Sequence, residues 1–123
     1  MNPFFPEIKK NFGFGCMRFP QTLGKIDMAA TEELLLHAVE SGVNYFDTAP
    51  VYLKGMSEEA TGIALSRHPR DRWLIATKMS NFRDWSYEAS IKMYHQSFEK
   101  LRVDTIDYYL LHSFGAPGDF DKR

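Results

Sequence analysis

The sequence predicts an α/β fold built on a parallel β-sheet, and three observations support this prediction. Short apolar runs that are typical of buried strands alternate with longer segments of helical periodicity. Strands that alternate with helices are joined by right-handed crossovers, which make neighbouring strands parallel. Each of the last three predicted strands also ends on an ionisable residue. Four strands and three helices in this order favour the first half of an eight-stranded (β/α)8 barrel of the TIM type, and a doubly wound, flavodoxin-like sheet is the alternative.

The composition is that of an ordinary soluble globular protein. The chain has 123 residues, of which 44% are hydrophobic and 25% charged, enough for one domain but not for two. Its formal net charge of -1 leaves no electrostatic footprint for nucleic acid or an anionic membrane. Cys16 is the only cysteine, which excludes an internal disulfide and a CxxC redox pair. The absence of a membrane-length apolar run and of a signal peptide predicts a cytoplasmic protein.

The first predicted strand, Phe12–Met17, contains two glycines, which allow another backbone or a ligand to come close. This G-x-G segment lacks the third glycine and the directly following helix of a Rossmann fingerprint. A loop is predicted for Pro20–Lys25. Asp27 is a candidate N-cap for a helix that runs to about Ser41 and ends at Gly42.

The second predicted strand, Val43–Phe46, ends on a carboxylate, Asp47. A turn then leads to Tyr52, and a helix is predicted from Ser57 to about Arg67. The serine that opens this helix is a candidate cap, and Glu58 in the first turn suits the helix dipole.

The last two predicted strands also end on ionisable side chains. Trp73–Thr77 is an apolar run typical of a strand buried on both faces, and Lys78 follows it. Tyr87–Leu101 has helical periodicity. Ile106–Leu111 is the fourth predicted strand, and it ends on His112.

Four residues converge if these strands are parallel neighbours, because the carboxyl ends of parallel strands meet at one edge of the sheet: Asp47, Tyr52, Lys78 and His112. By itself each has an ordinary structural explanation, such as a solvated turn lysine or a packed tyrosine. Together they form a proton-transfer set. A free tyrosine, with a pKa of about 10, is a weak acid at neutral pH, and a neighbouring ammonium stabilises its phenolate. A carboxylate can hold that ammonium, and a histidine can bond a substrate oxygen.

Five segments of the chain together resemble the aldo-keto reductase family. They are G-F-G-C-M-R at Gly13–Arg18, F-D-T-A-P-V-Y-L-K-G-M-S-E at Phe46–Glu58, A-T-K at Ala76–Lys78, S-F-E-K-L at Ser97–Leu101 and I-D-Y-Y-L-L-H at Ile106–His112. The D-T-A-x-x-Y-x-x-G-x-S-E pattern is highly specific, and the order and spacing of all the segments fit. The sequence of the first segment most resembles that of a bacterial or archaeal branch of the family, whose members often carry an additional C-terminal ferredoxin-like region.

The resemblance implies a (β/α)8 barrel that reduces small-molecule aldehydes or ketones with NADPH. It implies that Tyr52 is the general acid, that Lys78 and Asp47 tune it, and that His112 orients the carbonyl group. Four residues fall where the family approaches the nicotinamide end of NADP(H): Gly15, Cys16, Met17 and Asp47.

The chain departs from the family in its length. A barrel of this class takes about 250 residues, whereas this chain stops after the fourth predicted strand. We therefore expect residues 1–123 to form one incomplete domain, the N-terminal half of a barrel without the later phosphate-binding loops. The open edges of such a half-barrel predict a homo-oligomer with little or no reductase activity of its own.

Two other functions stay open. One is a non-catalytic nucleotide-sensing or assembly module that keeps the four converging residues as a relic. The other is a metal-dependent barrel hydrolase, which is less favoured because the four histidines form no H-x-H or H-E-x-x-H pair. No metal site and no nucleic-acid partner are predicted.

Overall fold

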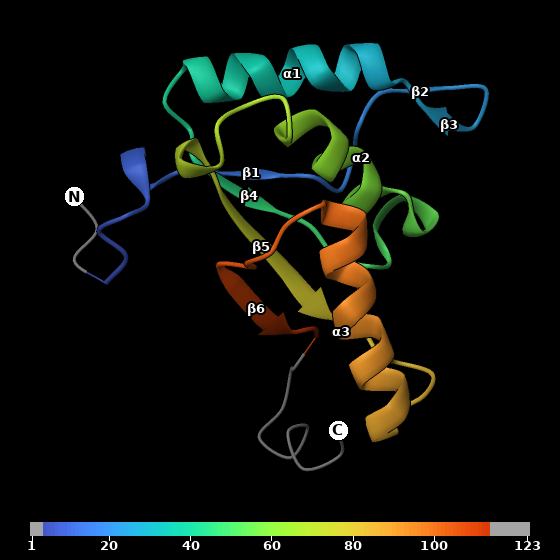
Figure 1. Ribbon diagram of the computed structural model, residues 1–123. Coiled ribbons are helices and arrows are strands. Elements are labelled where there is room, and N and C mark those ends of the chain that lie inside the picture. Colours follow the sequence, from blue (N-terminus) through green and yellow to red (C-terminus); the bar gives the residue numbers. More distant parts are fainter. Residues whose placement is uncertain (1–3, 114–123) are drawn as a thin grey trace.

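Four parallel strands form the sheet at the centre of the protein (Figure 1). The structure is a computed structural model, and it describes residues 4–113. The strands are β1 (Gly13–Gly15), β4 (Tyr45–Asp47), β5 (Leu74–Met79) and β6 (Tyr108–Leu111), in the order β1-β4-β5-β6. Each neighbouring pair is parallel. The predicted parallel α/β sheet is therefore confirmed.

Three helices cover one face of this sheet, as Figure 1 shows. They are α1 (Met28–Glu40), α2 (Ser57–Leu65) and α3 (Tyr87–Leu101), and α2 packs against both of the others. The predicted cap of the first helix is confirmed, because the side chain of Asp27 accepts a hydrogen bond of 3.0 Å from the backbone of Ala30. Gly42 follows that helix with a φ of 93°, a conformation that favours glycine.

The hydrophobic core lies between the sheet and the helices. Phe46 and Ile75 enter it from β4 and β5, and they meet Leu35, Leu65 and Leu101 of the three helices. Successive side chains of a strand point to opposite faces of the sheet. The residues on either side of Phe46 and Ile75 therefore point away from the helices, toward what would be the interior of a barrel.

Several predicted boundaries shift in the structure. β4 begins at Tyr45 rather than Val43, and β6 begins at Tyr108 rather than Ile106. β5 extends to Met79, so Lys78 lies within the strand instead of after it. The register decides these limits, because each strand residue must pair with a neighbour: Gly15, Asp47, Ala76 and Tyr108 form one continuous row across the sheet.

The loop predicted for Pro20–Lys25 is wrong, because part of it forms a small antiparallel hairpin. Its strands are β2 (Gln21–Thr22) and β3 (Lys25–Ile26). Leu23 and Gly24 turn the chain with φ values of 54° and 77°, and two successive positive φ angles are what a type I′ hairpin turn requires. The sequence hides this turn because its first position holds a leucine, which is 98% exposed, instead of the usual asparagine or aspartate.

Three short 3₁₀ turns complete the described chain: Lys9–Asn11, Tyr52–Gly55 and Arg70–Arg72. The second of them follows β4 at its carboxyl end, where the polar side chains gather. Among residues 4–113, no helix combines the length and apolar character that crossing a membrane requires.

Helices α2 and α3 approach each other closely at Gly62. A Cβ atom at this position would lie 2.6 Å from the carbonyl oxygen of Lys100 and 2.7 Å from the Cα of Leu101. Because both are backbone atoms, they cannot move aside without displacing the helix. We expect Gly62→Ala to lower the free energy of unfolding by about 1–3 kcal/mol, the usual cost of overpacking, as measured by urea denaturation followed by circular dichroism. Gly15→Ala is the matched control, since a Cβ at Gly15 meets no atom within 4 Å. A Gly62→Ala variant as stable as the control would contradict the close packing.

Candidate active site

An ion pair between neighbouring strands stands at the centre of the site. Nζ of Lys78 on β5 lies 2.8 Å from Oδ2 of Asp47 on β4, and it also donates to the carbonyl oxygen of Thr48 at 2.7 Å. The side chains of the lysine and the aspartate are 11% and 31% exposed. Two acceptors from one strand end therefore hold the ammonium group in a fixed, partly desolvated position.

Tyr52 lies beside this ammonium group. It opens the 3₁₀ turn after β4, and its backbone N–H donates to the carbonyl oxygen of Ala49 at 3.2 Å. Nζ of Lys78 lies 4.7 Å from the centre of the tyrosine ring. The next two residues, Leu53 and Lys54, have φ values of 53° and 55°, which are unfavourable for side chains with a Cβ. Strained backbone of this kind is concentrated at functional sites.

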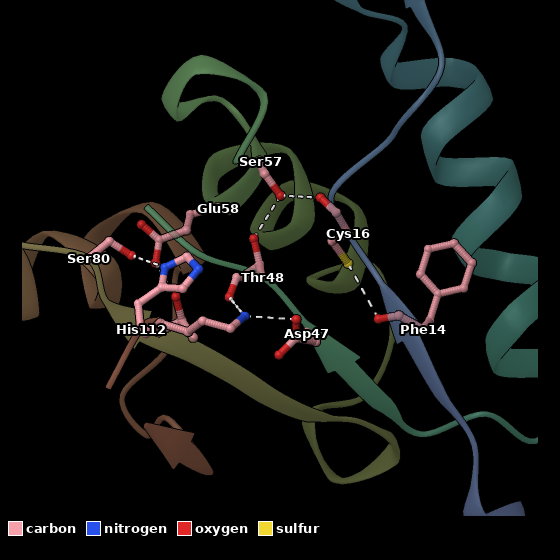
Figure 2. A network of polar contacts seen from close by, with 10 residues as sticks. Phe14, Cys16, Asp47, Thr48, Ser57, Glu58, Ser80 and His112 are labelled. Carbon is pink, nitrogen blue, oxygen red and sulfur yellow. Dashed lines mark hydrogen bonds and ion pairs between the residues drawn. The ribbon is translucent and has the colours of Figure 1, made fainter. Parts of the chain in front are cut away.

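His112 completes the group from the end of β6. Its backbone N–H donates to the carbonyl oxygen of Met79 at 3.1 Å, which continues the sheet to this residue. Its ring packs against Tyr52 at 5.8 Å between ring centres and against Phe82 at 5.1 Å. Its Nδ1 atom lies 2.7 Å from the hydroxyl oxygen of Ser80, as Figure 2 shows. The imidazole thus contacts two aromatic rings, and Ser80 bonds its Nδ1 atom.

Aromatic side chains pack together on the same face of the sheet as the ion pair, nearer to the amino ends of the strands. The rings of Tyr45 and Tyr108 are 5.4 Å apart, and Phe5 packs edge-on against Tyr108 at 5.9 Å. Gly13 makes room for these rings, because a Cβ there would lie 2.7 Å from a ring carbon of Tyr45. Burial raises the pKa of Tyr45, and the negative charge of Asp47 raises it further. Packed aromatic rings therefore border the polar site on the side of the amino ends of the strands.

A chain of hydrogen bonds ties the end of β1 to the end of β4 (Figure 2). The hydroxyl of Ser57 donates to the carbonyl oxygen of Cys16 at 2.5 Å, so it accepts from the hydroxyl of Thr48, which is 2.7 Å away. The backbone N–H of Cys16 in turn donates to the carbonyl oxygen of Asp47 at 2.8 Å. The interpretation of Ser57 as an N-cap is therefore wrong: Met56 precedes the helix, and the serine hydroxyl bonds a distant strand instead.

Glu58 has a different environment from the one that the sequence suggests. It is only 1% exposed, and its Oε2 atom accepts a hydrogen bond of 2.7 Å from the hydroxyl of Thr77 on β5. Burial, together with the nearby charge of Glu58, raises the pKa of Tyr109 to about 12. The carboxylate thus joins α2 to the helix-facing side of the sheet as well as lying in the first turn of its helix. The sequence contained a signal for the contact between Glu58 and Thr77, because the alternation of side chains along β5 turns Thr77 toward the helices.

The structure brings together the four residues that the sequence predicted to converge: Asp47, Tyr52, Lys78 and His112. The predicted cofactor residues of the first strand differ from one another. A Cβ atom at Gly15 would meet no other atom within 4 Å, and Met17 is 50% exposed. Cys16 is fully buried, and burial raises the pKa of its thiol to about 12. Within residues 4–113, no cluster of three or more His, Cys, Asp or Glu side chains is arranged to hold a metal ion.

The comparison with known families decides what kind of protein carries this arrangement. The model of the aldo/keto reductase family matches residues 11–120. The chain belongs to this family. A Bacillus subtilis relative described as the uncharacterized oxidoreductase YqkF is 36% identical over 120 residues, which cover 89% of this chain and 37% of the relative. The L-galactose dehydrogenase of Arabidopsis thaliana is 30% identical over 111 residues, covering 85% of this chain and 35% of that protein.

Solved structures of the family share the fold. An aldo-keto reductase from Klebsiella pneumoniae in complex with NADPH superposes with a TM-score of 0.67 at 28% identity, covering 85% of this chain and 35% of that chain. An aldo-keto reductase from Bacillus halodurans in its holo form gives a TM-score of 0.68 at 30% identity. The chain therefore spans little more than a third of the relatives compared, and its four strands are part of an aldo/keto reductase barrel. The assignment to a branch with a ferredoxin-like region stays a prediction.

Proposed function

We propose that this chain carries the proton-transfer half of an NADP(H)-dependent aldo/keto reductase site that acts on an aldehyde or ketone. The single observation that carries the proposal is the position of Lys78, whose ammonium group is bonded to Asp47 and lies 4.7 Å from the centre of the Tyr52 ring. Proton transfer to a carbonyl oxygen requires a general acid. An ammonium group beside that acid stabilises its conjugate base, and a carboxylate holds the ammonium group in place.

In this proposal Tyr52 donates a proton to the carbonyl oxygen of the substrate. The negative charge that remains on the phenolate is stabilised by Lys78, which the Asp47 carboxylate and the Thr48 carbonyl keep in place. The ring of His112 packs edge-on against the tyrosine ring, and the imidazole donates a hydrogen bond to the same substrate oxygen. Between them, these groups orient the carbonyl and supply the proton that its reduction requires.

The residues around the end of β1 fit a nicotinamide cofactor. The space above Gly15 is open, so a flat ring can come close to the backbone there, and the side chain of Asp47 is 31% exposed toward the same side. We assign the contacts to Gly15, Met17 and Asp47. Cys16 has a structural role in this proposal and does not contact the cofactor, because its thiol is buried and both of its backbone groups already bond within the protein. When bound, NADPH supplies the hydride for reduction.

The proposal is tested in a complete barrel, by which we mean a polypeptide in which residues 1–123 are followed by the remaining strands of an aldo/keto reductase. NADPH oxidation is followed at 340 nm against a panel of aldehydes and ketones. Turnover of members of the panel supports the proposal. The second candidate function is a nucleotide-sensing or assembly module with a relic site, and NADPH binding without turnover across the whole panel would favour it.

We also expect the 123-residue chain by itself to self-associate and to show little or no reductase activity. β1 and β6 are the outer strands of the sheet, so each has an edge without a neighbouring strand in the described chain. Apolar side chains on or beside these strands are exposed: Phe12 by 60%, Met17 by 50%, Leu110 by 40% and Leu111 by 47%. Open edges and apolar surface together favour pairing with a second copy.

Light scattering at micromolar concentration, together with the NADPH oxidation assay, measures both parts of this expectation. Leu110→Lys places a charge on the exposed edge and should shift the chain toward the monomer, whereas Leu23→Lys, on the distant hairpin, should not. A stable monomer that turns over aldehydes with NADPH would contradict the expectation.

A further inference from the structure

Ser80 contacts the histidine of the site from a buried position that the sequence did not single out. It lies directly after β5, two residues beyond Lys78, and only 4% of its surface is exposed. Its hydroxyl oxygen lies 2.7 Å from Nδ1 of His112 (Figure 2). Its own backbone N–H lies 3.2 Å from the sulfur of Met93 on α3, which fixes the loop against that helix. The serine is therefore held in place from one side and bonded to the imidazole on the other.

The direction of this hydrogen bond determines what the histidine can do. A neutral imidazole carries one hydrogen, and the nitrogen that bears it is set by the partner of the other nitrogen. If the serine hydroxyl donates to Nδ1, the hydrogen lies on Nε2. If the hydroxyl accepts from Nδ1, Nε2 keeps only a lone pair and cannot donate to a carbonyl oxygen.

We propose that Ser80 is a positioning residue that donates its hydroxyl hydrogen to Nδ1 of His112 and so fixes the Nε2–H tautomer. The Nε2–H group is then the one that bonds the carbonyl oxygen of an aldehyde or ketone. The rings of Tyr52 and Phe82 limit the tilt of the imidazole, and the bond to Ser80 limits its rotation. The 2.7 Å contact is compatible with either direction of the bond, so the choice of tautomer, like the choice of substrate, rests on the proposed function.

A serine bonded to a histidine can also be a nucleophile, but the burial of Ser80 argues against that role here. A nucleophilic hydroxyl must reach a substrate carbonyl carbon. Ser80 is 4% exposed and the next residue, Asn81, is 6% exposed, so the protein itself covers the hydroxyl. The geometry suits a group that acts through the histidine and does not touch the substrate.

The tautomer is measured directly by ¹⁵N NMR of the imidazole nitrogens in the 123-residue chain. In the wild type, His112 should be in the Nε2–H form. Ser80→Ala should increase the fraction of the Nδ1–H form, and Ser80→Thr, which keeps the hydroxyl, should restore the wild-type pattern. The other three histidines, His37, His68 and His95, are internal references that should not change. An Nδ1–H tautomer in the wild type, or identical spectra for wild type and Ser80→Ala, would overturn the proposal.

Kinetics of the complete barrel test whether the bond matters for reduction. Ser80→Ala should lower kcat/KM for the carbonyl substrate by about tenfold, the effect of losing roughly one hydrogen bond to a positioned group. The KM for NADPH should stay the same, and Ser80→Thr should recover most of the rate. Ser66→Ala, at an exposed serine that follows α2, is the matched control. Unchanged kcat/KM in Ser80→Ala would overturn the positioning role. A wild-type barrel without turnover would instead contradict the proposed function, and the NMR result would still determine the tautomer.

Discussion

Tyr52→Phe is expected to lower the kcat of carbonyl reduction by about 10²–10⁴-fold, the usual contribution of general acid–base catalysis. The substitution removes the hydroxyl and keeps the ring. The ring contacts with His112 at 5.8 Å and with the ammonium group of Lys78 at 4.7 Å are therefore preserved. The loss should appear in kcat, because a proton donor acts on the reacting oxygen more strongly in the transition state than in the bound ground state.

The measurement is NADPH oxidation at 340 nm by the complete barrel, with cofactor affinity from fluorescence titration as the second readout. Affinity for NADPH should be unchanged in Tyr52→Phe. Tyr87→Phe is the matched control, because Tyr87 is 79% exposed at the start of α3. If Tyr52→Phe keeps the wild-type rate, the tyrosine is not the acid.

Lys78→Met is expected to lower kcat by about 10²–10³-fold, the size of effect found when one preorganised electrostatic group is removed. Methionine retains most of the length of the side chain without the charge, so the phenolate left by Tyr52 loses its nearest cation. The same change leaves the carboxylate of Asp47 without its ion-pair partner and removes a hydrogen bond to the carbonyl oxygen of Thr48. We therefore expect a loss of stability as well as a loss of activity.

A double variant separates these two effects. Asp47→Asn in combination with Lys78→Met removes the unpaired charge, so the free energy of unfolding should recover relative to the single variant. Activity should stay low, because the ammonium group is still absent. Lys92→Met is the control on the exposed surface of α3. A single Lys78→Met variant with an unchanged rate and pH profile would remove Lys78 from the mechanism, and recovery of activity in the double variant would show that its loss was only structural.

The convergence of the site residues was predictable because three of them lie at or next to the end of a strand, and Tyr52 opens the turn that follows β4. Parallel strands bring their carboxyl ends to one edge whatever the details of their packing, so Asp47, Lys78 and His112 had to meet once the strand order was known. Errors of up to two residues in the strand boundaries did not disturb this prediction. Alternation along each strand preserves the face on which a residue lies.

The supporting contacts were not predictable in the same way. Ser57 looked like a helix cap and Glu58 like a residue that complements a helix dipole, because both explanations need only neighbours in the sequence. Their actual partners, the carbonyl oxygen of Cys16 and the hydroxyl of Thr77, come from other elements 41 and 19 residues away. Ser80 was missed for the same reason, since its partner His112 is 32 residues away.

By itself, the sequence determined the alternating α/β plan, the parallel sheet, the position of each helix and the identity of the four converging residues. Those features follow from local periodicity and from the fixed geometry of strand ends, which act over a few residues at a time. Only the tertiary structure decided which side chains hold those four residues in place. It also decided that Gly13 lies against an aromatic ring while Gly15 faces open space, and that part of Pro20–Lys25 folds into a hairpin. A hydrogen bond or a close contact depends on distances of a few ångströms between elements, and such distances are set only when the helices and strands have packed together.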